Sequence, residues 1–269
     1  MTHPARATLP NASLTVAALP GPTSAQPTSA QPTAAQSPGY QGIYQPGQAG
    51  MAGLKPVRVQ RVKPRTVQRS YLLMDDSGSM SGQKAHQANE AASAYMQALS
   101  DPQYRDGHLV SVISFDDQPI LQVSAVKPSE VIGKAYVSGQ GGTCIGAALE
   151  LARDDMPRWT PGPMQMEVAA PICTLMTDGC TSDAALAERV ANELKGQGVV
   201  VVAVAVGDDA DVALLSRLAS DPALCVVVSE ASGSKLRAVY QIVGQTVGDS
   251  ANQSQPLLPA LVAAFKAAK

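Results

Sequence analysis

The sequence predicts an α/β fold, a Rossmann-like, doubly wound and mainly parallel sheet with helices on both faces. Three observations indicate it. Strand-length apolar runs alternate with helix-length amphipathic stretches between residues 70 and 248. Val199–Val206 is a continuous apolar run rich in valine, typical of a central strand buried on both faces. Two other apolar runs each end in an aspartate, Asp75 and Asp178, and parallel sheets bind ligands beyond the carboxyl ends of their strands.

The chain before this domain divides into two segments of different composition. Residues 1–53 are rich in Ala, Pro, Gln, Thr, Ser and Gly, with a five-residue repeat through Thr23–Ser37. Such a segment buries too little apolar surface to offset its ordering entropy, so we expect a disordered tail. Residues 54–69 are a basic linker with interspersed valines.

Charge is distributed unevenly along the chain. Residues 1–70 hold seven basic and no acidic residues, and the remainder holds 13 basic and 22 acidic residues, a formal charge of −9. A basic run can bind nucleic acid or an anionic membrane. The linker has no aromatic residues for base stacking, however, and an acidic domain follows it. We therefore favour a strap that lies on the acidic domain or on an acidic partner, and expect neither nucleic acid nor membrane as ligand.

The elements of the domain, residues 70–248, follow from periodicity and flanking residues. Tyr71–Met74 is predicted as the first strand, and Gln83–Leu99 as a helix because its apolar and small residues fall near one face. The remaining elements, in order, are strands at Leu109–Phe115 and Ile120–Val126, a helix at Ile145–Arg153, a strand at Pro171–Met176, a helix at Asp183–Lys195 with Ser182 as N-cap, a strand at Val199–Val206, a helix at Val212–Ser220, a strand at Leu224–Val228 and a helix at Ser234–Val247.

Residues 249–269 form a carboxy-terminal tail with a short apolar helix at Pro256–Lys266. This helix either docks on a partner or packs onto its own domain.

The end of the first strand carries a pattern of oxygen ligands. Asp75 is followed by hydroxyl residues at steps of two, Ser77 and Ser79. If the backbone stays near-extended beyond the strand, these three side chains point the same way, and Gly78 allows a tight turn between them. Hard oxygen ligands with little negative charge suit Mg²⁺ or Mn²⁺ and leave the ion electrophilic.

Two distant segments supply further ligands of the same kind. Gly141-Gly142-Thr143 places a hydroxyl on a glycine turn, and Thr177-Asp178-Gly179 repeats the strand that ends in an aspartate. In this order the three segments resemble the metal-ion-dependent adhesion site (MIDAS) of von Willebrand factor type A (VWA) domains. The matching positions are Asp75, Ser77, Ser79, Thr143 and Asp178.

The resemblance implies a protein-binding module. In that family the hydroxyls bind the ion, the aspartates act largely through bridging waters, and an acidic side chain of the partner fills the open position. The sequence around the motifs further resembles bacterial TerY-like VWA proteins, which are associated with tellurium resistance and stress systems, often beside a kinase and a phosphatase. The resemblance thus implies an adaptor in the cytoplasm. Two alternatives stay open, a substrate-recruiting subunit of a MoxR- or chelatase-type AAA+ ATPase and a metal-dependent hydrolase.

Purely structural roles for these residues are the alternative to a metal site. Asp75 alone could cap a turn, with Ser77 and Ser79 satisfying local backbone groups, but three motifs in order favour the metal site. Asp208, Asp209 and Asp211 follow another strand, where an acidic loop is favoured over a second ion.

Features of enzymes and of secreted proteins are missing from the sequence. It has no Gly-x-Ser-x-Gly elbow and no Walker-type phosphate loop, so we expect no enzyme activity. No apolar run reaches membrane-spanning length and the start lacks a secretory core, so we expect cytoplasmic residence. Cys144 and Cys180 each lie one or two residues from a proposed ligand. Reduced thiols without a role are favoured over redox control.

Overall fold

The computed structural model describes residues 66–104, 107–156, 167–229 and 232–268. All of them belong to one compact unit, Val59–Lys269. The predicted disordered tail, residues 1–53, and residues 54–65 of the predicted basic linker lie outside the described residues. Within the described part of the chain, no helix has the length and apolarity needed to cross a membrane.

Seven strands of the described residues form one sheet, whose main path has the order β3-β2-β1-β5-β6-β7, with β4 beside β1. All pairings are parallel except the one between β2 and β3. The strands are β1 (Thr66–Asp75), β2 (His108–Phe115), β3 (Pro119–Val126), β4 (Glu167–Val168), β5 (Ile172–Thr177), β6 (Val200–Val206) and β7 (Cys225–Val228).

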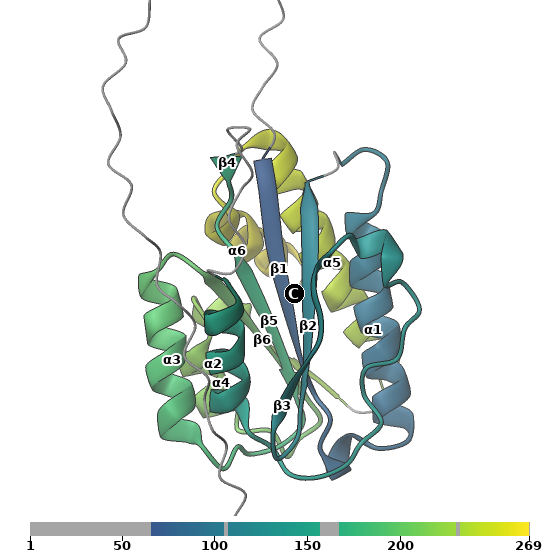
Figure 1. The fold of residues 1–269 in the computed structure, drawn as a ribbon, viewed down its shortest axis with the longest axis vertical. Helices are drawn as coiled ribbons and strands as arrows, with labels where there is room; N and C mark the ends of the chain where they lie inside the picture. Colours follow the sequence, from purple (N-terminus) through teal and green to yellow (C-terminus); the bar gives the residue numbers. More distant parts are fainter. Residues whose placement is uncertain (1–65, 105–106, 157–166, 230–231, 269) are drawn as a thin grey trace, which may run out of the picture. The chain divides into compact units, whose positions relative to one another are not determined.

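Helices cover both faces of this sheet, as predicted. Figure 1 shows α1 and α5 on one side and α2, α3 and α4 on the other. The helices are α1 (Gln83–Leu99), α2 (Ile145–Asp155), α3 (Ala184–Gly196), α4 (Val212–Leu218), α5 (Gly233–Gln253) and α6 (Leu257–Ala267), with short 3₁₀ turns η1 (Gly78–Met80), η2 (Pro128–Glu130) and η4 (Pro222–Leu224).

The centre of the sheet is buried on both faces. Every residue of β5 and of β6 is buried, which explains why β6 is an unbroken apolar run and why the polar residues of β5 are threonines alone. Because β1 pairs with β2 on one side and with β5 on the other, its carboxyl end lies between theirs. We call the edge at which the parallel strands end the carboxyl edge, and the edge at which they begin the amino edge.

Two segments are more ordered than the sequence suggested. β1 starts at Thr66, so Thr66–Arg69, assigned to the linker by composition, form the beginning of the central strand. At the other end of the chain, α6 buries Leu257, Leu261 and Phe265. Of the two roles considered for this apolar helix, packing onto its own domain is the one observed, because its apolar side chains join the domain core.

A polar cluster lies at the amino edge, formed by Arg69, Tyr71, Ser111, Ser124 and Asp155, and all of these residues except the exposed Ser124 are buried. The Asp155 carboxylate accepts hydrogen bonds from the Tyr71 hydroxyl (3.1 Å), Ser124 Oγ (3.0 Å) and Ser111 Oγ (3.4 Å). The Arg69 guanidinium lies 4.0 Å from the same carboxylate and donates to the Tyr71 hydroxyl. We call this group the Asp155 cluster. It joins β1, β2 and β3 to the end of α2.

Candidate metal centre

The first motif folds into a tight loop between β1 and α1. Asp75 is the last residue of β1 and is fully buried, and its Oδ1 accepts a hydrogen bond from the Ser77 backbone N–H at 2.8 Å. The backbone then turns through η1 instead of staying extended as predicted, because the buried Met80 closes a turn back to the Ser77 carbonyl (2.9 Å). The two serine hydroxyls still meet, with Ser77 Oγ 3.0 Å from Ser79 Oγ.

The third motif meets the first at the carboxyl edge. Asp178 directly follows β5, the neighbour of β1, and it is buried. Ser79 Oγ donates to Asp178 Oδ1 at 2.7 Å, across 99 residues of sequence. Thr177 Oγ1 donates to Asp75 Oδ2. Thr177 was not among the predicted site residues, although its place one residue before Asp178, at the end of a neighbouring strand, was a usable signal.

The loop that carries Thr143 is fixed by two carboxylates, one just after the end of β1 and one just after the end of β2. Asp76 Oδ1 accepts from the backbone N–H groups of Ser138 (2.5 Å) and Gly139 (2.6 Å), and Asp117 Oδ1 accepts from Gly142 (3.0 Å). Gly139 has φ +86°, and a Cβ there would lie 2.3 Å from Ser81 Cα, so only glycine fits. Asp76 and Asp117 therefore position this loop.

Thr143 lies beside the turn that follows Asp178. Its Oγ1 is 3.6 Å from the point that a Cβ on Gly179 would occupy. Its backbone carbonyl accepts hydrogen bonds from the Ser182 N–H (3.0 Å) and the Ser182 hydroxyl (3.1 Å). The structure thus brings the Thr143 loop against the Asp178 loop. All three predicted motifs meet at one edge of the sheet.

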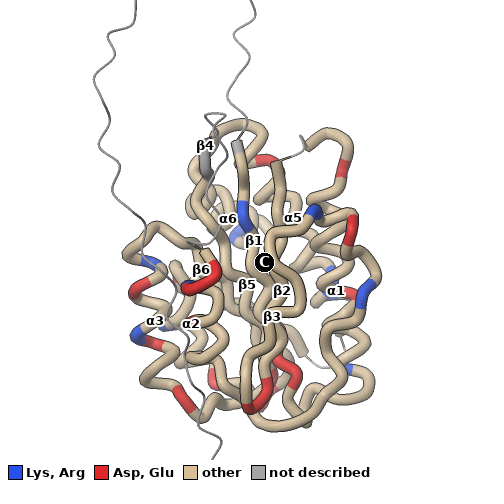
Figure 2. The backbone as a smooth tube through the Cα atoms, viewed as in Figure 1, with Lys and Arg blue, Asp and Glu red and all other residues tan. Residues whose placement is uncertain are grey.

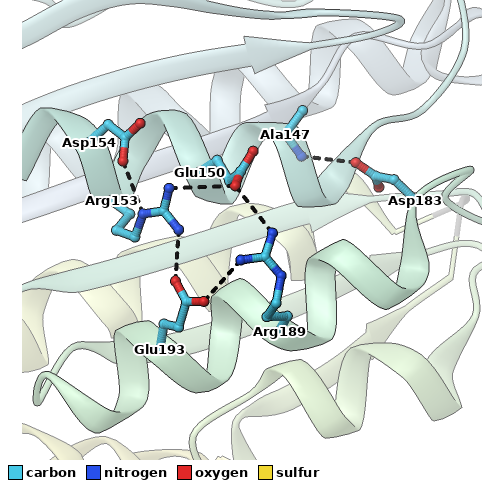
Figure 3. Close-up of polar contacts among 7 residues, drawn as sticks. All are labelled: Ala147, Glu150, Arg153, Asp154, Asp183, Arg189 and Glu193. Atoms are coloured by element: carbon cyan, nitrogen blue, oxygen red, sulfur yellow. Dashed lines mark hydrogen bonds and ion pairs between the residues drawn. The ribbon is translucent and has the colours of Figure 1, made fainter.

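The loop after Asp178 also caps the helix that follows Thr143. Asp183 accepts from the backbone N–H groups of Gly146 and Ala147, both at 2.9 Å, at the start of α2, and Figure 3 shows the contact with Ala147. The prediction that Ser182 is the N-cap of the next helix is wrong. Asp183 holds the N-cap position of α3 but makes no side-chain cap bond there, because its carboxylate serves α2 instead.

Ion pairs fasten the far halves of the same two helices. Arg153 of α2 donates to Glu193 of α3 at 2.7 Å, and Glu193 also accepts from Arg189 at 3.1 Å (Figure 3). The Glu193 carboxylate beside it raises the pKa of Arg153. These groups are partly exposed, so each pair adds little stability, but together they hold α2 and α3 in register.

One basic side chain reaches the centre. Lys84, in the first turn of α1, places Nζ 2.6 Å from Asp178 Oδ2. The two oxygens of this carboxylate are thus bonded by two donors from the same short segment, Ser79 and Lys84. Sequence reasoning missed Lys84, since a lysine on an amphipathic helix is ordinarily a solvated residue.

The electrostatics of the centre favour a cation. Burial raises the pKa of Asp75, the hydrogen bonds from Thr177 and Ser77 oppose that rise, and the nearby Asp178 carboxylate adds to it. Figure 2 shows further acidic segments among the loops at this end of the sheet. The described residues contain no group of three or more His, Cys, Asp or Glu able to hold a metal. The centre offers hydroxyl groups together with two carboxylates, and these are oxygen ligands of the kind that a hard divalent ion binds.

Two cysteines and an acidic loop near the centre form hydrogen bonds with the backbone. Cys144 Sγ contacts the Asp117 carbonyl at 3.4 Å, and Cys180 Sγ contacts the Asp209 carbonyl at 3.8 Å. Both cysteines are free thiols, and a redox role for them stays a prediction. In the acidic loop after β6, Asp211 caps α4 by accepting from the Leu214 N–H at 2.9 Å.

Solved structures share this fold. Proximal thread matrix protein 1 from the mussel byssus, determined with a zinc-occupied MIDAS motif, is 23% identical over 71% of this chain and 46% of its own, with a TM-score of 0.52. The pilus adhesin SpaC from Lactobacillus rhamnosus GG is 16% identical over 70% of this chain and 30% of its own, with a TM-score of 0.58.

A third solved structure, a von Willebrand factor type A protein from Catenulispora acidiphila, is 18% identical over 68% of this chain and 43% of its own, with a TM-score of 0.53. This chain therefore spans less than half the length of each of these three proteins. No curated protein sequence matches it significantly.

The family assignment comes from the sequence itself. The model of the von Willebrand factor type A domain matches residues 71–242, more than half of the chain. The matched segment runs from β1 into α5 and contains every residue of the candidate centre. The chain belongs to the von Willebrand factor type A domain family.

Proposed function

We propose that the carboxyl edge is a metal-ion-dependent adhesion site through which the protein binds a partner protein. Ser77, Ser79 and Thr143 would hold Mg²⁺ or Mn²⁺ directly, and Asp75 and Asp178 would supply the negative charge. The observation that carries the proposal is the 2.7 Å contact between Ser79 and Asp178, since it joins two motifs from different strands at one point. The zinc-occupied motif of the mussel protein supports this kind of site as one that accepts a divalent ion.

The residues of the centre divide the work between them. A bound ion would supply an electrophilic position for an outside carboxylate. Ser77, Ser79 and Thr143 are neutral ligands, so they leave the charge of the ion largely uncompensated. The buried Asp75 orients the loop through the Ser77 N–H, and Thr177 holds its other oxygen. Such a centre favours a partner that presents an exposed Asp or Glu.

Von Willebrand factor type A domains are interaction modules, and we propose this one as a non-enzymatic adaptor in the cytoplasm. The TerY-like sequence around the motifs points to a stress-response system with a kinase or phosphatase as partner. A recruiting subunit of an AAA+ ATPase is the runner-up, and it differs in one measurable property, because such a subunit stimulates ATP hydrolysis by its motor. A metal-dependent hydrolase ranks third.

Two measurements test the proposal, one of ion binding and one of partner binding. Calorimetry with MgCl₂ and MnCl₂ is expected to show uptake of one ion by the wild-type chain and about 10- to 100-fold weaker uptake by Asp75→Asn. Asp208→Asn, which removes an exposed carboxylate at the same edge, should bind like wild type.

Partner binding is measured by affinity capture of the partner protein in Mg²⁺ and in chelator. Capture should be lost in chelator and with Asp75→Asn, while circular dichroism shows that the variant is folded. Ion uptake that Asp75→Asn leaves unchanged, or capture that persists in chelator, would refute the proposed site.

A further inference from the structure

Lys84 occupies a position that is unfavourable for a lysine. It is the second residue of α1, where the exposed N–H groups of the helix present partial positive charge. The first turn of α1 contains no acidic residue that would offset it. Natural sequences break such local rules mainly at functional sites, where another interaction compensates.

The compensating interaction is with the candidate centre. Lys84 Nζ lies 2.6 Å from Asp178 Oδ2, where the Asp178 side chain is 0% exposed and the Lys84 side chain is 16% exposed. Asp75, also buried, adds a second carboxylate to the same centre. One ammonium group therefore compensates one of two buried negative charges, and the second is left to hydrogen bonds from hydroxyl and N–H groups.

We propose that Lys84 is a built-in counter-cation of this centre, which a divalent ion displaces from Asp178. The inference rests on the proposed metal site and names how that site is regulated. While no ion is present, the ammonium group neutralises Asp178 and holds the Asp178 loop against the start of α1. Ion and ammonium are like charges competing for one buried carboxylate, so binding of the ion is an exchange and not a simple addition.

This exchange has two consequences that can be measured. The ion binds more weakly than it would at the same oxygens without the lysine, so the centre responds to changes in ion concentration instead of staying saturated. The ion-free domain is also more stable with Lys84 than without it, because Asp178 would otherwise be buried without a cation.

The first test is calorimetry on the full-length chain with MgCl₂ as the only ligand. Lys84→Gln is expected to bind the ion about tenfold more tightly than wild type, and to melt at a lower temperature in chelator. Lys235→Gln is the matched control, since Lys235 also lies in the first turn of a long helix but is exposed. It should leave both quantities unchanged. Equal or weaker ion binding by Lys84→Gln would overturn the exchange.

The second test needs no variant, so it holds even if Lys84→Gln fails to fold. Wild-type protein is acetylated briefly with an N-hydroxysuccinimide ester in chelator and in Mg²⁺, and each lysine is quantified by mass spectrometry. Lys84 should react several-fold faster in Mg²⁺, because the ion has displaced it, and Lys235 should react equally in both. Equal reactivity of Lys84 in the two conditions would overturn the exchange.

The two proposals fail in different ways. If the wild-type chain takes up no divalent ion, the proposed function and the exchange both fall. If it takes up an ion but Lys84→Gln and the labelling show no difference, only the exchange falls and the metal site stands.

Discussion

Asp155 at the amino edge and Asp178 at the carboxyl edge are both almost fully buried, yet they are compensated in different ways. Asp155 is surrounded by donors from three strands of the sheet, with Arg69 as its cation. Asp178 is bonded by donors from one short segment, Ser79 and Lys84. The first arrangement is closed and built into the sheet. The second is held by Ser79, a proposed metal ligand, and by Lys84, whose flexible side chain can move away.

The difference indicates a division of labour within one sheet. A buried charge with fixed partners contributes to a unique fold, and removal of one partner is strongly destabilising. A buried charge whose partners are hydroxyls and one flexible ammonium can exchange them for an external ion. We therefore expect the amino edge to control stability and the carboxyl edge to control binding.

Asp155→Ala should give the largest effect on stability. It leaves the Arg69 guanidinium and the Tyr71 hydroxyl buried without their carboxylate, which costs about 3–5 kcal/mol of unfolding free energy. The neighbouring Asp154→Ala is the control, because Asp154 is 56% exposed and forms a surface pair with Arg153, so a change below about 1 kcal/mol is expected. Urea unfolding in chelator measures both. Similar losses for the two variants would remove the distinction between the closed cluster and a surface pair.

The second-largest expected effect is a loss of stability in acid, which we assign to His108 at the amino edge. His108 begins β2 and is buried with Nδ1 unpartnered, and burial lowers its pKa to about 4. The unfolded chain therefore takes up the proton first, near its ordinary pKa of about 6.5. The stabilisation is fully present above that value and is lost as the pH falls towards 4, by up to about 3 kcal/mol.

The measurement is the urea-unfolding free energy of wild type, His108→Phe and His86→Gln across this pH range. His108→Phe should lack this part of the loss, and His86→Gln, with its exposed ring, should keep it. If the unfolding free energy fell equally with pH in all three chains, the acid sensitivity would come from a group other than His108.

Asp183→Ala should give the smallest of these stability effects, about 1–2 kcal/mol, because it uncaps α2 without burying a charge. It should also weaken ion uptake, since Thr143 directly precedes that helix start. Ser182→Ala is the informative control. If Ser182→Ala proved the more destabilising in urea, the contact of Asp183 with the start of α2 would not be the main contribution of this loop to stability.

Much of the fold and part of the site could be predicted from the sequence. The predicted bounds of α1 were confirmed to the residue, because one apolar face and the flanking Gly82 mark it clearly. Strand ends at Asp75 and Asp178 were also predicted correctly, since apolar runs stop there abruptly. Parallel neighbours then bring the two aspartates together without any further information.

The remaining features depend on contacts between segments far apart in sequence. Asp183 is predicted from the sequence as the first residue of a helix, but its carboxylate bonds the start of α2. Lys84 reads as a solvated helix residue, and Asp155 as one at the exposed end of a helix. Local patterns cannot reveal that each of them meets a group about 40 to 90 residues away. The Thr66 start of β1 was missed for a related reason, since basic residues there obscure a strand that the sheet buries.

The span of 99 residues between Ser79 and Asp178 has a consequence for biosynthesis. A ribosome-bound chain that ends before β5 carries the hydroxyls of Ser77, Ser79 and Thr143 but neither Asp178 nor the strand that aligns it, so the proposed magnesium site is incomplete. Ion uptake would then report completed folding. Because the denatured chain lacks the proposed site, rising magnesium would pull the population towards the native state by mass action alone.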